Sequence, residues 1–324
     1  MTRQTWYSIL FSVVLFVFLM PSTASSQVVL PRGASTVAPL LHSVHIEELT
    51  WVEVRDAIAT GHTTVIVPLA AIEQNGPYMA TGKHVYVVKG IAEATARVLG
   101  NALVAPVVPL GPGGSVEQVL AGVSDPPIQG HMRWPGSMGV RREVYQELLA
   151  DILGNLRYHG FLDIVVISEH EGFSSEESPG PAVETVATVN ERWGSGKAIA
   201  HFIPEYRDHL ISDPEGSHAA TFLRDVFGVV EEVVDQEVPE AGQNYLLDGR
   251  NPVGTHDGYY FSSVLQAVHP AAVRAAERIA AGPQVSYGVD WGSLKQLAAN
   301  GRKLIEYRAG VTADYIRKAI SGSR

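Results

Sequence analysis

Short, continuous apolar runs alternate with longer amphipathic segments along this chain. Uninterrupted apolar runs of this length predict strands buried on both faces of a sheet. They occupy residues 63–71 (TTVIVPLAA), 101–111 (NALVAPVVPLG), 161–168 (FLDIVVIS) and 198–206 (AIAHFIPEY).

Segments with helical periodicity separate these runs, at residues 50–59, 89–100, 140–159 and 182–193. Thr50 and Glu53 have capping-box spacing at the start of the first segment, and Gly100 ends the second. Alternating strands and helices predict an α/β fold, a three-layer α/β/α sandwich with a mostly parallel central sheet. We expect a single domain over residues 27–324, with an irregular or inserted region at about 228–260.

The first 26 residues differ from the rest of the chain. Arg3 precedes an apolar run over residues 9–20, and Pro21 and five small residues follow. This order is typical of a signal peptide, with cleavage expected after Ser26 and a periplasmic or secreted mature chain. An uncleaved membrane anchor is the alternative, but the run is shorter than the roughly 20 residues that span a bilayer.

Composition narrows the classes of function. The 324 residues carry a formal net charge of -10 and no basic run, which argues against a nucleic-acid-binding protein. There is no cysteine, so thiolate catalysis and cysteine-bound metals are excluded. Any metal ion must be held by His, Asp, Glu or Asn side chains.

Polar residues follow two of the predicted strands directly. Glu73 and His84 lie after the first strand, and His170 lies after the third. Ligands of parallel α/β sheets bind beyond the carboxyl ends of the strands, so these side chains are expected at one edge. Two imidazoles and one carboxylate form a common hydrolytic zinc site. The alternative is that Glu73 only caps a turn and that the histidines, two of 12 in the chain, are ordinary polar residues.

Several segments resemble the creatininase family of metal-dependent amidohydrolases. The opening LTWVEVRDAIATGHTTVIVPLAAIEQNGPYMATGKH resembles the family's strand followed by E-x-H-G-P-H-L-P-x-x-x-D. HMRWPGS, YHGFLDIVVISEHEG and the closing YGVDWGSLKQLAANGRKLIEYRAGVTADYIRKAI resemble later family segments in the same order. The resemblance implies hydrolysis of a small amide or cyclic amide with Zn or Mn, and a homo-oligomer.

The departures from the family pattern are concentrated at one of its two metal positions. The resemblance implies that Glu73, His84 and His170 form one ligand set, with His84 in place of a bridging aspartate. Asn75 stands where the other ion's histidine is expected, and Gly172 stands where its acidic ligand often lies. A neutral imidazole cannot bridge two ions as a carboxylate can. We therefore expect one divalent ion.

The remaining candidates concern proton transfer and substrate binding. The resemblance suggests His218 as the group that protonates the leaving nitrogen, and Glu171 beside His170 is a second candidate. Four residues are candidates for contact with a small-molecule substrate: Asn75, Tyr78, His131 and Trp134. The segment Trp134-Pro135-Gly136 could equally be a packing corner.

Three functions are compatible with these features of the sequence. The leading hypothesis is an exported hydrolase that acts on a carbon–nitrogen bond through a metal-activated water. The first alternative is a non-catalytic extracytoplasmic protein that binds a small molecule on the same fold. The second is a hydrolase or isomerase of sugar-like carbonyl compounds.

Overall fold

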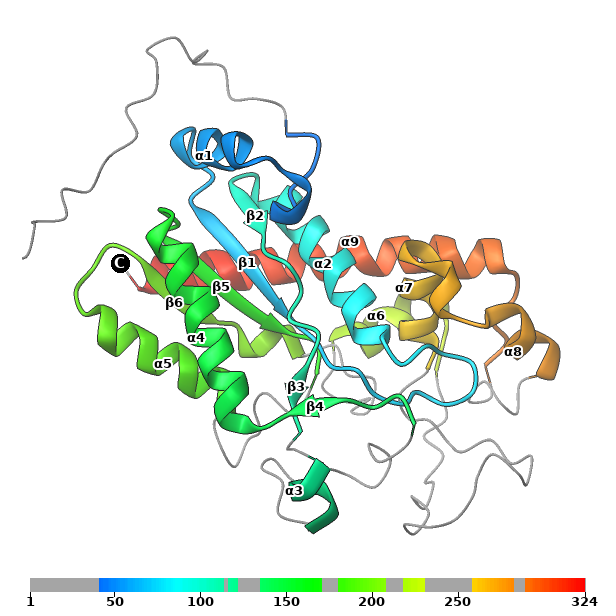
Figure 1. Cartoon of the computed structure of the whole chain (residues 1–324). Helices are drawn as coiled ribbons and strands as arrows, with labels where there is room; N and C mark the ends of the chain where they lie inside the picture. Colours follow the sequence, from blue (N-terminus) through cyan, green and yellow to red (C-terminus); the bar gives the residue numbers. More distant parts are fainter. Residues whose placement is uncertain are drawn as a thin grey trace, which may run out of the picture. The chain divides into compact units, whose positions relative to one another are not determined.

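A parallel four-stranded sheet forms the centre of the fold (Figure 1). The computed structural model describes residues 41–113, 116–121, 135–170, 180–207, 218–230, 258–282 and 289–323. The strand order is β2-β1-β5-β6, and all three pairings are parallel. The strands are β1 (Thr64–Leu69), β2 (Ala102–Val104), β5 (Asp163–Ser168) and β6 (Ile199–Phe202). The predicted mostly parallel sheet is confirmed.

Helices cover both faces of this sheet. Side chains alternate along β1, so that Val65 and Val67 pack on one face and Ile66 packs on the other. The Ile66 face is covered by α2 (Lys83–Leu99), α7 (Tyr259–Val268) and α9 (Leu294–Gly322). The opposite face is covered by α1 (Trp51–Ala59), α4 (Arg142–Tyr158) and α5 (Pro181–Trp193). Both faces of β1 and β5 are therefore buried, which explains their continuous apolar sequences.

Helix ends agree with the predicted signals in two places and differ in one. The Thr50 and Glu53 capping box is present at the start of α1. Gly100 ends α2 with a left-handed φ of 79°, a conformation that glycine adopts without steric cost. However, α2 begins at Lys83 rather than near residue 89, so His84 lies in its first turn.

The second predicted strand is much shorter than its apolar run. Only Ala102–Val104 pairs with β1 as a regular strand, and the next residues include Pro106 and Pro109. Proline has no N–H to donate to a sheet, so regular pairing with β1 is interrupted along this part of the run, at the edge of the sheet. The chain instead makes an isolated bridge between Leu69 and Val108, and then enters β3 (Gly111–Pro112).

Shorter elements complete the described part of the chain. They are η1 (Ile46–Glu48), α3 (Val116–Ala121), β4 (Gly139–Val140), η4 (Pro204–Arg207), α6 (His218–Phe227), η5 (Pro270–Ala272) and α8 (Ala275–Ala281). β3 and β4 pair in parallel as a separate small sheet.

Two sequence predictions fall on other parts of the chain. The proposed signal peptide over residues 1–26 lies outside the described residues, as do residues 231–257 of the predicted irregular region. At its end, that region includes the first residues of α7. Among the described helices, none combines the length and apolar character needed to cross a membrane.

Candidate metal centre

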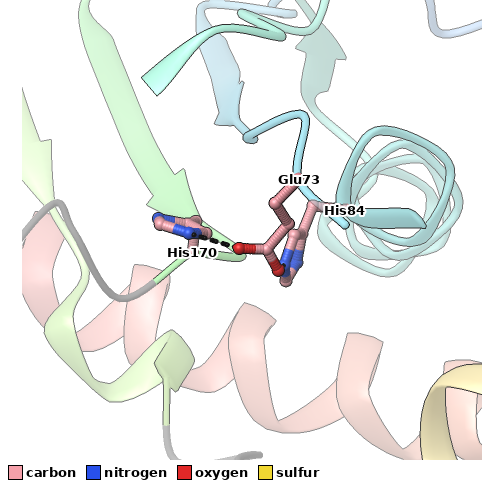
Figure 2. A group of neighbouring side chains, drawn as sticks. All are labelled: Glu73, His84 and His170. Atoms are coloured by element: carbon pink, nitrogen blue, oxygen red, sulfur yellow. Dashed lines mark hydrogen bonds and ion pairs between the residues drawn. The ribbon is translucent and has the colours of Figure 1, made fainter. Parts of the chain in front are cut away.

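Two polar side chains from neighbouring parts of the sequence and a third from a distant part meet at the carboxyl edge of the sheet (Figure 2). Glu73 lies in the loop after β1, and His170 follows β5, which pairs with β1 as far as Leu69 and Ser168. His84 enters from the first turn of α2. The parallel register of β1 and β5 therefore brings the two post-strand segments together, as the sequence predicts.

Both imidazoles face the Glu73 carboxylate. Nε2 of His84 lies 2.7 Å from Oε1 of Glu73, and Nε2 of His170 lies 3.1 Å from Oε2. One ligand atom from each of the three residues lies within 4.8 Å of the other two. The Glu73 side chain is fully buried, the His84 side chain is 5% exposed, and the His170 side chain is 18% exposed. His170 is thus the most solvent-accessible member of the trio.

His84 is held in its neutral form. Burial is the main cause, and the nearby positive charge of Lys83 adds to it, so that the pKa of His84 falls from 6.5 to about 3. The Glu73 carboxylate acts in the opposite direction but does not offset burial. A neutral imidazole is the form that coordinates a metal ion, because the ring nitrogen must present a lone pair.

A buried lysine belongs to the same cluster. Nζ of Lys83 lies 3.4 Å from Oε1 of Glu73, and the Lys83 side chain has no exposed surface. The ammonium group also lies 4.3 Å from the centre of the Phe261 ring, a distance at which a cation is attracted to the face of an aromatic ring. The sequence interpretation assigned no role to Lys83. The one sequence feature that could have indicated such a role is the position of Lys83 directly before His84, a candidate ligand.

The loop between Glu73 and His84 is held by backbone pairing. Ala80 N–H donates to the Ala272 carbonyl at 2.8 Å, and Met79 forms an antiparallel bridge with Val273. Arg274 N–H donates to the Tyr78 carbonyl at 2.7 Å. These contacts fix the loop against the segment that leads into α8.

Asn75 also stabilises this loop. Its side-chain amide donates to the carbonyls of Glu73 at 2.9 Å and Ala80 at 3.0 Å, and the residue is buried. It therefore ties the two ends of the turn to each other. Its predicted role in substrate contact stays a prediction.

A second segment lies against the Glu73 side of the loop. Met138 N–H donates to the Ile72 carbonyl at 2.9 Å, and Gln74 N–H donates to Ser137 Oγ at 3.0 Å. Ser137 and Met138, which follow His131 and Trp134 in sequence, thus lie against the residues on either side of Glu73. Both of those side chains lie outside the described residues.

The structure locates other predicted residues only in part. Tyr78 is partly exposed, and the Arg278 guanidinium lies 5.6 Å from the centre of its ring. His218 is the first residue of α6, but its side chain is outside the described set. Glu171 also lies outside it. The roles proposed for these three residues stay predictions.

Glu169, on the other side of His170, points into the interior. Its carboxylate accepts a hydrogen bond from the Tyr206 hydroxyl. Arg308 from α9 donates to the Tyr206 carbonyl at 2.9 Å and to the Tyr260 hydroxyl at 2.7 Å. All four residues are buried, so this network anchors the residue that precedes His170.

The trio fits a single divalent ion. Imidazole nitrogen and carboxylate oxygen are the usual zinc ligands in a cysteine-free site, at about 2.0 to 2.2 Å from the ion. The three ligand atoms already lie close to one another, and His84 is neutral. Three protein ligands leave a fourth position for water or substrate, as in catalytic rather than structural zinc sites.

Comparisons with known proteins give the same family as the sequence motifs. The profile Creatininase, described as creatinine amidohydrolase, matches residues 47–314. A comparison with curated protein sequences finds no match.

Solved creatininase structures share the fold at low sequence identity. A creatininase variant of Zn-Zn type is 19% identical, with a TM-score of 0.56, over 86% of this chain and 98% of its own. The structure described as Creatininase Mn is 18% identical, with a TM-score of 0.55, over 85% of this chain and 98% of its own. A creatininase variant complexed with creatine is 19% identical, with a TM-score of 0.55, over 85% of this chain and 98% of its own. The profile match over most of the chain shows that this protein belongs to the creatininase family.

Proposed function

We propose that this protein is a metal-dependent hydrolase that acts on a small amide or cyclic amide. The observation that carries the proposal is the convergence of Glu73, His84 and His170 from three separate segments. The proposed cofactor is one Zn or Mn ion. Support comes from family membership and from relatives described as Zn-Zn type, as Mn and as complexed with creatine.

The chemistry follows from the ligand set. A bound divalent ion would lower the pKa of a coordinated water and polarise a substrate carbonyl. In this chain, Glu73, His84 and His170 would hold the ion, and burial of Glu73 and His84 would keep water away from two of the three ligands. His170 is the most exposed of the three, so we place the substrate on its side.

Proton transfer and substrate contact are assigned to residues around this centre. His218 or Glu171 would protonate the leaving nitrogen, because an imidazole or carboxyl group can act as acid and base near neutral pH. Tyr78, Asn75, His131 and Trp134 would contact the substrate. The mature chain would be exported and would form a homo-oligomer.

The decisive experiment removes one ligand without disturbing the core. His170→Ala should lose the bound ion and at least about 100-fold in turnover of small amides, while retaining the wild-type circular dichroism spectrum. His159→Ala is the matched control, because His159 is exposed at the end of α4. Metal content of the purified chains and amide turnover are measured together.

The outcomes separate the candidate functions. Wild-type protein that turns over amides without any bound metal would contradict the proposal. Protein that binds neither Zn nor Mn and shows no turnover would instead favour the non-catalytic binding protein. Metal-dependent turnover of keto sugars but not amides would favour the sugar-directed enzyme.

A further inference from the structure

Lys83 contacts the ligand trio, and the proposed function does not use its charge. It lies one residue before His84, and its ammonium group is 3.4 Å from the Glu73 carboxylate. Both side chains are fully buried. A buried charge is strongly unfavourable unless an opposite charge accompanies it, so Lys83 and Glu73 stabilise each other within the interior.

The ammonium group cannot easily leave the centre. It lies over the Phe261 ring of α7, 4.3 Å from its centre, while the same ring contacts the His84 imidazole edge-on at 5.7 Å. The Lys83 ammonium group therefore contacts the Glu73 carboxylate and the Phe261 ring. A fixed positive charge lies beside a carboxylate that two imidazoles also face.

We propose that Lys83 is a built-in counter-cation that limits the centre to one divalent ion and weakens the binding of that ion. This inference rests on the proposed function, because it concerns the same Glu73, His84 and His170 ligands. Oε1 of Glu73 is shared between His84 and Lys83, and Oε2 faces His170. An incoming ion would thus meet a carboxylate whose charge Lys83 already balances.

Electrostatics gives the direction of the effect. Like charges a few ångströms apart in a poorly solvated site repel strongly, and a divalent ion feels twice the repulsion of a monovalent one. A second divalent ion beside Lys83 would meet this repulsion with no further carboxylate among the three ligands to offset it. Removing the charge of Lys83 should therefore raise metal affinity, although Lys83 is not itself a ligand.

The test compares metal binding by wild type and Lys83→Met, a neutral side chain of similar length. Full-length proteins are stripped with chelator and titrated with Zn²⁺ alone and with Mn²⁺ alone, and bound metal is counted after gel filtration. Wild type should bind one ion per chain, and Lys83→Met should bind it at least about tenfold more tightly. Lys89→Met is the matched control on the same helix, because Lys89 pairs with Glu47 at the surface.

Thermal unfolding distinguishes an electrostatic role from simple packing. Without metal, Lys83→Met should unfold at a lower temperature than wild type, because Glu73 has lost its cation. With saturating metal, the difference should shrink, since the ion then supplies the positive charge. A packing role would lower both melting temperatures equally and leave the Kd unchanged, which would overturn the inference.

Other outcomes are equally decisive. If wild type binds two ions per chain, the inference is wrong while the proposed hydrolase stands. If wild type binds no ion but Lys83→Met does, Lys83 weakens metal binding as inferred, but the proposed one-ion hydrolase and the one-ion limit are both wrong. If neither binds, both proposals fail. Should Lys83→Met not fold without metal, Lys83→Gln gives the same comparison with an amide that can still donate to Glu73.

Discussion

Among the described residues, polar and charged side chains at the carboxyl edge of the sheet form two neighbouring groups. One consists of Glu73, Lys83 and the two imidazoles, and the other links Glu169 with Arg308 through tyrosines. Burial and the Glu169 carboxylate both raise the pKa of the Tyr206 hydroxyl well above its usual value, so this hydroxyl stays protonated and donates to Glu169. The second group therefore acts as a rigid polar support behind His170.

Arg308 should be essential to this support. Arg308→Met would leave Glu169 buried without its nearby cation and would remove two hydrogen bonds to Tyr206 and Tyr260. We expect a loss of about 3 to 5 kcal/mol in the free energy of unfolding, measured by urea denaturation. Arg317→Met, on the exposed side of the same helix, is the control and should change stability by less than about 1 kcal/mol. Equal stability of the two variants would contradict this role.

At the scale of elements, the contact between α7 and α9 depends on one glycine. A side-chain Cβ built at Gly301 of α9 would overlap the carbonyl oxygen of Ser263 in α7. Ser262 and Ser263 are themselves fully buried small residues at this crossing. The two helices thus approach at a distance that only glycine permits. The same α7 carries Phe261, so the crossing also positions the ring beside Lys83 and His84.

Gly301→Ala should therefore be strongly destabilising. The added methyl group would force α7 and α9 apart, and overpacking of this kind costs about 1 to 3 kcal/mol or more. Gly310→Ala is a control within the same helix, because a Cβ there meets nothing within 4 Å. It should instead raise stability by about 0.5 to 1 kcal/mol. Denaturant midpoints of both variants test the contrast, and a neutral Gly301→Ala would show that the crossing can relax.

At the scale of the whole molecule, the two apolar cores form without the metal ligands. Residues of α2, α7 and α9 pack on one face of the sheet, and residues of α1, α4 and α5 pack on the other. Lys83 already provides a counter-charge for Glu73. We therefore expect the metal-free protein to be folded, unlike small domains whose fold depends on a structural metal.

Metal should then add stability by mass action. At a free Zn²⁺ concentration 100 times the Kd, the free energy of unfolding should rise by about 2.7 kcal/mol, with a matching rise in melting temperature. His170→Ala should show little of this rise. Calorimetry with and without chelator makes the measurement. Complete unfolding of the wild type on chelation would show a structural rather than a catalytic metal.

The sequence by itself determined the elements that depend on local pattern. Continuous apolar runs marked β1 and β5, because a strand between two helical layers is buried on both faces. Thr50 and Glu53 marked the start of α1 because both members of a capping box lie within one turn. Ligands of parallel sheets bind beyond the carboxyl ends of the strands, and this rule alone predicts that Glu73 and His170 lie at one edge.

Only the tertiary structure decided how the side chains around that edge are used. Lys83 belongs to the cluster because α2 begins at Lys83, several residues before the predicted start at residue 89. In addition, α7 places Phe261 against the Lys83 ammonium group. Asn75 was a substrate candidate by motif, but its amide bonds depend on how residues 73–80 fold back on themselves. The physical reason is that periodicity reports which face of an element is buried, while charge pairing and close helix contact depend on residues far apart in sequence.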